Sequence, residues 1–185
     1  MSSTNRGATR NESDFYPTPH QAIDSIMLEI DWRTVNTVLE PALGDGRILD
    51  HVVRMKPDLY TDWYEIQKER NYLDGATHHL RFAGNPGDSK ASTRPWDLVI
   101  TNPPFSLAQE FITQALLDGR SVAMLLRLGF LGSQKRRPFW TTHPVHRLFV
   151  LSERPSFTGT GTDSTDYAWF CWGPDFIRPR GVYSI

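Results

Sequence analysis

Residues 96–105 read Trp-Asp-Leu-Val-Ile-Thr-Asn-Pro-Pro-Phe, an apolar run that ends in an amide, two prolines and an aromatic ring. The run over 96–101 is typical of a strand that is buried on both faces of a parallel sheet. Two successive prolines fix φ and remove two N–H donors, so they predict a rigid bend at the end of that strand. The stretch therefore indicates a sheet protein in which one buried strand presents polar and aromatic groups at its carboxyl end.

Strand and helix patterns alternate along the rest of the chain. Helical spacing of apolar residues is predicted to begin near Pro19, after residues 44–46 and after Phe105, with a short helix or loop over 133–140. The further predicted strands are 36–40, 59–66, 79–83, 121–128, 146–152 and 166–172. With 96–101 these make seven strands. The pattern predicts an α/β fold with a mostly parallel sheet, helices on both faces and an antiparallel last strand.

The length of 185 residues suits one domain with a sizeable core. Residues 1–13 are polar and lack the apolar stretch of a secretory signal, so we expect a flexible tail there and one domain over 14–185. No apolar run approaches the roughly 18 residues of a membrane span. The lone Cys171 cannot form an intramolecular disulfide, which fits the reducing cytoplasm, and the six scattered histidines predict no metal site.

Charge is unevenly distributed along a chain whose net charge is −1. Residues 120–154 hold seven Lys and Arg against one acid, and Lys135, Arg136 and Arg137 are consecutive. Such a segment could bind the phosphates of a nucleic acid. A solvated face with internal ion pairs is the alternative, and charge alone does not decide between the two.

The sequence Val-Leu-Glu-Pro-Ala-Leu-Gly-Asp-Gly at 38–46 joins a strand to a helix through Glu40, Gly44 and Gly46. Glycines let the backbone approach a ligand closely, and the amides that begin a helix attract electronegative atoms. A tight turn without any ligand uses the same residues, so both interpretations stay open.

Glu65 ends the next predicted strand, about twenty residues beyond the glycines. A carboxylate at this place can accept hydrogen bonds from both hydroxyls of a ribose. The structural alternative is a weak surface ion pair with Lys68 or Arg70.

The Asn-Pro-Pro-Phe group at 102–105 could hold a planar amino group. Asn102 contributes a side-chain acceptor and Pro103 a backbone carbonyl, and two such acceptors can receive both hydrogens of one exocyclic amino group. Phe105 offers a flat surface on which a nucleobase can stack, an interaction of roughly 1 to 3 kcal/mol. An ordinary Pro-Pro turn explains Pro103 and Pro104, but neither the asparagine nor the aromatic residue in the loop.

At these residues the sequence resembles the class I S-adenosylmethionine-dependent methyltransferases, and within them the enzymes that methylate the N6 amino group of adenine in DNA. Asn-Pro-Pro-Phe matches their catalytic motif, Phe-Tyr-Pro-Thr-Pro at 15–19 resembles their N-terminal cofactor motif, and residues 39–46 resemble their glycine motif. The order of the motifs is similar to the γ arrangement and spans roughly 14–172. The resemblance implies a Rossmann-like catalytic domain with S-adenosyl-L-methionine as cofactor.

The resemblance also implies roles for individual residues. Thr18 would flank the methionine end of the cofactor, Glu65 would bind its ribose, Ile66 and Phe111 would contact its adenine ring, and Asp88 would accept from its adenine amino group. The cofactor-binding set is Tyr16, Thr18, Pro19, Glu40, Pro41, Ala42, Gly44, Gly46, Glu65, Ile66, Asp88, Asn102 and Phe111. The catalytic set is Asn102, Pro103, Pro104 and Phe105, with Phe157 as a second base-stacking aromatic and Lys135, Arg136 and Arg137 on phosphates.

The implied reaction is methyl transfer to the N6 amino group of adenine in DNA, on a base that is single-stranded or flipped out of the duplex. We see no separate target-recognition domain and expect low sequence specificity, as in the small adenine methyltransferases of phages and mobile elements. Methylation of adenine in RNA, or of a protein glutamine amide, is an alternative because the motif can hold any planar amino group. A protein that binds cofactor or nucleic acid without activity is the non-enzymatic alternative.

Overall fold

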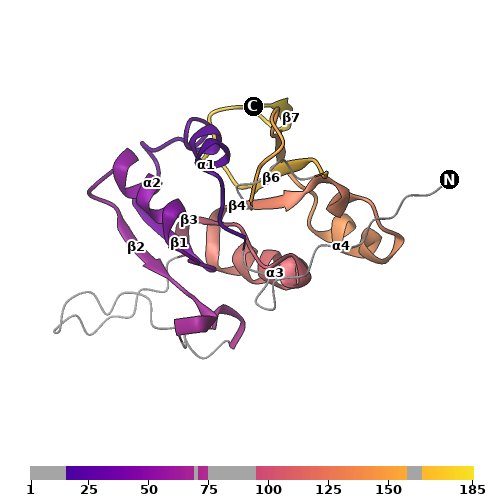
Figure 1. Ribbon diagram of the computed structural model, residues 1–185, viewed down its shortest axis with the longest axis horizontal. Coiled ribbons are helices and arrows are strands. Elements are labelled where there is room, and N and C mark those ends of the chain that lie inside the picture. The colour runs from indigo at the N-terminus through magenta and orange to yellow at the C-terminus, as the bar shows by residue number, and fades with distance from the viewer. Residues whose placement is uncertain (1–15, 69–70, 75–94, 158–163) are drawn as a thin grey trace.

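The computed structural model describes residues 16–68, 71–74, 95–157 and 164–185, which form a sheet with helices around it (Figure 1). The strands are β1 (Thr37–Glu40), β2 (Tyr60–Trp63), β3 (Trp96–Thr101), β4 (Gly119–Arg127), β5 (Arg147–Val150), β6 (Tyr167–Trp172) and β7 (Gly181–Ser184). The helices are α1 (His20–Met27), α2 (Arg47–Met55), α3 (Ala108–Asp118) and α4 (Arg137–Thr142). Short 3-10 turns include η2 (Tyr72–Asp74), η3 (Phe105–Leu107), η4 (Leu128–Leu131) and η5 (Gln134–Arg136).

The described residues form a seven-stranded sheet in the order β2-β1-β3-β4-β6-β5-β7. Strands β2, β1, β3 and β4 are parallel, whereas β6 runs antiparallel to both β4 and β5. The predicted α/β class, the mostly parallel sheet and the antiparallel pairing of 166–172 are therefore confirmed. The predicted strand 79–83 lies outside the described residues, and β7, which the sequence pattern did not indicate, pairs parallel to β5.

Two layers of apolar side chains cover the two faces of the sheet, as the sequence predicted. The α1 and α2 side chains pack on one face with Leu98 and Ile100 of β3, while α3 and α4 pack on the other face with Val99. This alternation follows from the two-residue period of a strand. Strand β3 is therefore buried on both sides of the sheet over most of its length.

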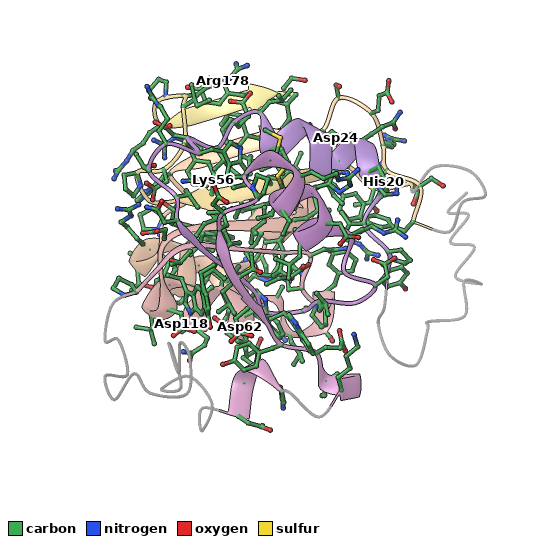
Figure 2. All side chains as sticks on the ribbon, turned by 90° about the vertical axis from the view of Figure 1, so that its left-hand side faces the viewer. His20, Asp24, Lys56, Asp62, Asp118 and Arg178 are labelled. Carbon is green, nitrogen blue, oxygen red and sulfur yellow. The ribbon has the colours of Figure 1, made fainter. Side chains whose placement is uncertain are left out.

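Helix α1 begins at His20, directly after Pro19, and has no side-chain hydrogen bond at its amino end. The Trp169 indole N–H of β6 donates to the Ala22 carbonyl at 2.8 Å and holds α1 against the sheet. Asp24 of α1 lies 3.2 Å from the imidazole of His51 on α2. Figure 2 shows His20 and Asp24 on α1, with Lys56 just beyond the end of α2. Helix α1 is thus held against both the sheet and α2.

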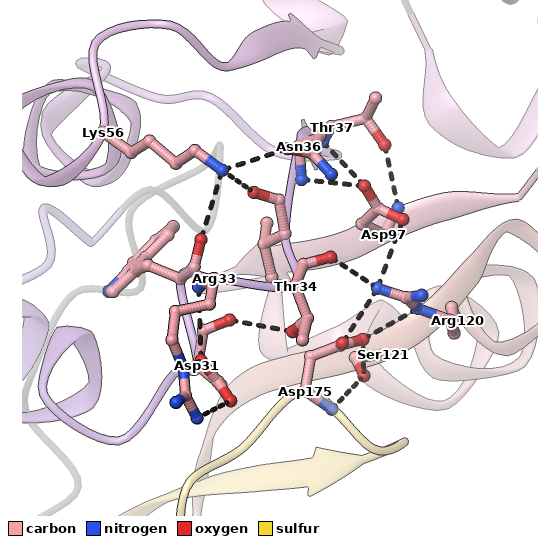
Figure 3. A network of polar contacts seen from close by, with 12 residues as sticks. Asp31, Arg33, Thr34, Asn36, Thr37, Lys56, Asp97, Arg120, Ser121 and Asp175 are labelled. Atoms are coloured by element: carbon pink, nitrogen blue, oxygen red, sulfur yellow. Dashed lines mark hydrogen bonds and ion pairs between the residues drawn. The ribbon is translucent and has the colours of Figure 1, made fainter.

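A polar network joins the amino ends of β1, β3 and β4 (Figure 3). Asp97 of β3 accepts hydrogen bonds from the backbone N–H groups of Asn36 and Thr37 at 2.8 and 3.0 Å. Arg120, at the start of β4, pairs with Asp175, which is 3% exposed. These contacts stabilise the amino ends of the parallel strands, opposite their carboxyl ends.

Among the described residues, no helix combines the length and the apolar character that crossing a bilayer requires.

Candidate active site

A cavity of about 330 Å³ opens at the carboxyl ends of β1 and β3. These strands are neighbours in the sheet, and the chain leaves them in opposite directions, toward β2 and toward β4. A crevice at such a switch point is the usual ligand site of an open α/β sheet. Its lining comes from parts far apart in the sequence, namely 16–18, 40–48, 65–66 with 71–72, and 102–111.

Most of the predicted site residues line this cavity. They are Tyr16, Thr18, Glu40, Pro41, Ala42, Gly44, Glu65, Ile66, Asn102, Pro103, Pro104, Phe105 and Phe111. Pro19 and Gly46 each directly adjoin a lining residue in the sequence but are not part of the lining, and Asp88 lies outside the described residues. Phe157 is outside the lining but contacts Phe105. The basic residues Lys135, Arg136 and Arg137 do not reach the cavity either.

The Asn102 amide is held in one orientation by the segment before α1. Its Nδ2 group donates to the Tyr16 carbonyl at 3.0 Å and to the Thr18 hydroxyl at 3.1 Å. Its Oδ1 atom is buried and has no hydrogen-bond partner among the described residues. A buried acceptor without a partner costs roughly 1 to 3 kcal/mol. The Asn102 side chain therefore has an acceptor without a partner among the described residues at the end of β3, and the two hydrogen bonds from Nδ2 fix its orientation.

Phe105 is not the isolated loop aromatic that the sequence suggested. Its ring lies 5.8 Å from that of Tyr16, with 30° between the planes, and 6.4 Å from that of Phe157. Tyr167 is 5.8 Å away, and the Arg127 guanidinium lies 4.8 Å from the Phe105 centroid. Phe105 and Phe157, which the sequence analysis expected to stack on a nucleobase, therefore contact each other and belong to one aromatic cluster beside Asn102.

The glycine turn adopts the conformation that its residues permit. Gly44 and Gly46 have φ angles of 56° and 85°, in the left-handed region that favours glycine. Glu65 accepts the Gly44 N–H through Oε2 at 2.8 Å. The predicted ribose acceptor is thus joined to the glycine turn, and both line the same cavity.

Glu40 is a buried acid at the base of the cavity, with 1% of its surface exposed. Burial raises the pKa of its carboxyl well above the usual value, and nearby Asp45, Asp50 and Glu65 raise it further. The Leu49 N–H, which donates to Glu40 at 3.2 Å, acts in the opposite direction. A cation in the cavity would favour the ionised form of this group.

Several lining residues were missed by the sequence analysis. Arg47 donates to the Thr18 carbonyl at 3.0 Å, and Tyr72 of η2 donates its hydroxyl to Asp118 at 2.8 Å. Arg47 directly follows the glycine motif, so its place next to Gly46 was a usable signal. No such signal marked Asn71 and Tyr72, because only the path of the chain after β2 brings them to the cavity.

The basic segment divides into two groups. Arg120 and Arg154 form ion pairs with Asp175 and Asp166, and Arg147 is 8% exposed and donates to backbone carbonyls. These three fit the alternative of internal pairing. The other four lie at or beyond the end of β4. Arg127 is its last residue and donates to the Tyr167 hydroxyl, and Lys135, Arg136 and Arg137 follow, of which Arg136 donates to the Phe130 carbonyl. This group extends from the Phe105 cluster into η5 and α4, on the carboxyl-end side of the sheet.

No protein-family model matches the sequence, and no curated protein matches it either. Solved structures do resemble the fold. The modification subunit of a putative type I restriction enzyme from Vibrio vulnificus has a TM-score of 0.57 at 17% identity, over 93% of this chain and 46% of that one. A putative RNA methyltransferase from Pyrococcus horikoshii also reaches 0.57 at 17% identity, over 86% and 87%.

A putative class I S-adenosylmethionine-dependent methyltransferase from Listeria monocytogenes has a TM-score of 0.57 at 14% identity, over 94% of this chain and 66% of that one. At such identities the likeness shows the fold, which is the Rossmann-like fold of class I S-adenosylmethionine-dependent methyltransferases. The chain spans about half the length of the Vibrio modification subunit.

Proposed function

We propose that this chain is an S-adenosylmethionine-dependent methyltransferase that acts on the N6 amino group of adenine in DNA, with motifs in the γ order. The observation that carries the proposal is the fixed amide of Asn102. Its donors are bonded to Tyr16 and Thr18, and its buried Oδ1 lacks a partner within the described part of the chain. An exocyclic amino group is the chemical complement of such an acceptor.

The residues around the cavity fit S-adenosylmethionine. Ile66 is 66% exposed although apolar, and with Phe111 it offers an apolar surface suited to an adenine ring. Glu65 offers a carboxylate acceptor suited to ribose hydroxyls, and a positively charged group of the cofactor near Glu40 would favour the ionised form of that buried carboxyl. Asn102, whose buried Oδ1 lacks a partner among the described residues, lines the same cavity, and there it would meet the amino group of the methyl acceptor. When bound, the cofactor supplies an electrophilic methyl group.

The chain itself contributes positioning and electrostatics. Asn102 Oδ1 and the Pro103 carbonyl accept the two hydrogens of the adenine amino group, which draws its nitrogen toward a tetrahedral and nucleophilic form. In-line transfer would break the bond from the methyl group to the sulfonium sulfur as the bond to the amino nitrogen forms, and the nitrogen would then release one proton to solvent, so no strong base is needed. Holding both reactants in line removes much of the entropic barrier.

The target adenine has to leave the duplex or be single-stranded, because a stacked base cannot reach the cavity. Unstacking costs a few kcal/mol. Stacking on Phe105, with Phe157 beside it, would offset that cost. The segment that contains Lys135, Arg136 and Arg137 would bind phosphates, which adds affinity without sequence information.

The test is transfer of a tritiated methyl group to DNA, RNA and protein side by side, with Asn102→Ala as the control. We expect label in DNA, reduced by more than about a hundredfold in the variant, as when a preorganised polar contact is removed. Label in DNA that survives the substitution would refute the role of Asn102.

Label in RNA or protein instead of DNA would support the alternative substrates. RNA is the stronger of these, because glutamine methyltransferases with this motif generally carry tyrosine where this chain has Phe105. Cofactor binding without any transfer would support the non-enzymatic alternative. Sequencing of methylated plasmid tests the expected low specificity, which a single long target motif would exclude.

A further inference from the structure

The cavity holds an arginine to which the sequence motifs assign no role. Arg47 is the first residue of α2 and lines the cavity, with 29% of its side chain exposed. Its Nε donates to Asp45 at 2.8 Å and its Nη1 to the Thr18 carbonyl at 3.0 Å. Because Thr18 in turn accepts from Asn102, one guanidinium connects the glycine turn to the catalytic amide.

Arg47 also has donors to spare. A guanidinium has five N–H bonds. In Arg47 the Nε–H and one Nη2–H donate to Asp45, and one Nη1–H donates to the Thr18 carbonyl. The remaining two have no acceptor in the part of the chain that the structure describes. A planar arginine fork suits a carboxylate, and the positive end of α2 favours an anion at the same place.

We propose that Arg47 binds the carboxylate of the cofactor's methionine moiety and thereby couples cofactor binding to the position of Asn102. The inference rests on the proposed function, since it requires the methionine end of the cofactor beside the glycine turn. Asp45, paired with the same guanidinium, faces the ammonium group of the same zwitterion. Arg47 thus binds the cofactor through its two remaining N–H donors and positions Thr18 through the hydrogen bond from Nη1.

The experiment compares two ligands, one with and one without the amino-acid moiety that bears this carboxylate. S-adenosylhomocysteine carries the amino-acid moiety, whereas 5′-methylthioadenosine lacks it, and calorimetry measures the affinity of each without any methyl transfer. Arg47→Gln should weaken S-adenosylhomocysteine about tenfold or more, the size expected for one charge-assisted hydrogen bond, and leave methylthioadenosine within about twofold. Arg47→Lys, which keeps the charge but not the fork, should recover part of the affinity.

Arg33→Gln is the matched control. Arg33 forms the same kind of ion pair two residues from its partner Asp31, but its side chain is 87% exposed and outside the cavity lining. This variant should bind both ligands like the wild type.

Unchanged binding of S-adenosylhomocysteine by Arg47→Gln would overturn the inference while the proposed function stands. Equal weakening of both ligands would also overturn it, because the substitution would then have damaged the whole cavity. A wild-type chain that binds neither ligand would overturn the proposed function together with the inference.

Discussion

The Asn102 amide nitrogen lies 3.1 Å from the Thr18 hydroxyl, although 84 positions separate the two residues in the sequence. Thr18 is 4% exposed, so this contact is shielded from water. It joins the segment before α1 to the end of β3 and, together with the bond to the Tyr16 carbonyl, fixes the orientation of the amide.

Substitution of Thr18 by valine should lower kcat. The change keeps the shape but removes the acceptor, so the Asn102 amide retains only one of the two bonds that orient it. We expect kcat for DNA methylation to fall about tenfold, which corresponds to one buried hydrogen bond. Thr18→Ser retains the hydroxyl and should stay near wild type. Equal activity of the valine and serine variants would contradict the prediction.

Replacement of Phe105 by leucine should weaken the use of DNA more than the binding of cofactor. Removal of base stacking, worth roughly 1 to 3 kcal/mol, predicts a decrease of about five- to 150-fold in kcat/KM for an oligonucleotide. Affinity for S-adenosylhomocysteine, measured by calorimetry, should change little. Phe105→Tyr keeps an aromatic face and serves as the control. A decrease of similar size in both measurements would argue against a stacking role.

The buried Glu40 should make the folded state less stable as the pH rises. Its pKa in the folded protein lies well above the ordinary value of 4.5, so the folded state binds more protons than the unfolded state across that interval. The contribution of Glu40 to the free energy of unfolding should therefore be greatest below pH 4.5 and should decrease as the pH rises through the raised pKa.

Urea unfolding at a series of pH values measures this effect. Glu40→Gln should remove the decrease and be more stable than wild type at neutral pH. Parallel pH profiles for the wild type and the Glu40→Gln variant would show that the carboxyl does not carry the effect.

Substitution of Gly46 by alanine should destabilise the fold. Gly46 has φ 85°, and a Cβ there would meet only Leu43 at 3.8 Å, so backbone strain rather than crowding sets the cost. That strain is about 1 to 2 kcal/mol. Gly129, around which an added Cβ would meet no atom within 4 Å, is the control, and Gly129→Ala should be near neutral. Chemical denaturation compares the two variants, and equal stability would contradict the prediction.

Lys135 and Arg137 should contribute to DNA affinity through phosphates. Both are exposed, and neutralising both to glutamine should reduce the slope of log affinity against log salt by about 0.7 to 0.9 for each phosphate that is no longer bound. Arg154→Gln, whose arginine pairs with Asp166, should leave the slope unchanged. Fluorescence anisotropy with a labelled oligonucleotide measures the slope. An unchanged slope in the double variant would place the phosphate-binding residues elsewhere.

The sequence pattern predicted the elements that form the centre of the fold. The apolar run of β3, the helical spacing after Phe105 and the apolar run of β6 each depend on neighbouring residues, so they are visible without coordinates. Strand β7 was missed because Gly181–Ser184 is short and half-exposed and becomes a strand only through pairing with β5. The interpretation of 120–154 as one basic surface was incomplete, because only the fold brings Arg120 and Arg154 to their acidic partners.

The sequence by itself determined the chemistry available at the ends of β1 and β3, because motif residues such as Asn102, Glu40 and Gly44 are recognisable from type and spacing. Only the tertiary structure decided how that chemistry is arranged. The direction of the Asn102 amide depends on Tyr16 and Thr18, and the place of Arg47 depends on α1 lying beside α2. Hydrogen bonds between residues far apart in the chain have no local sequence pattern, so their partners become known only when the chain is folded.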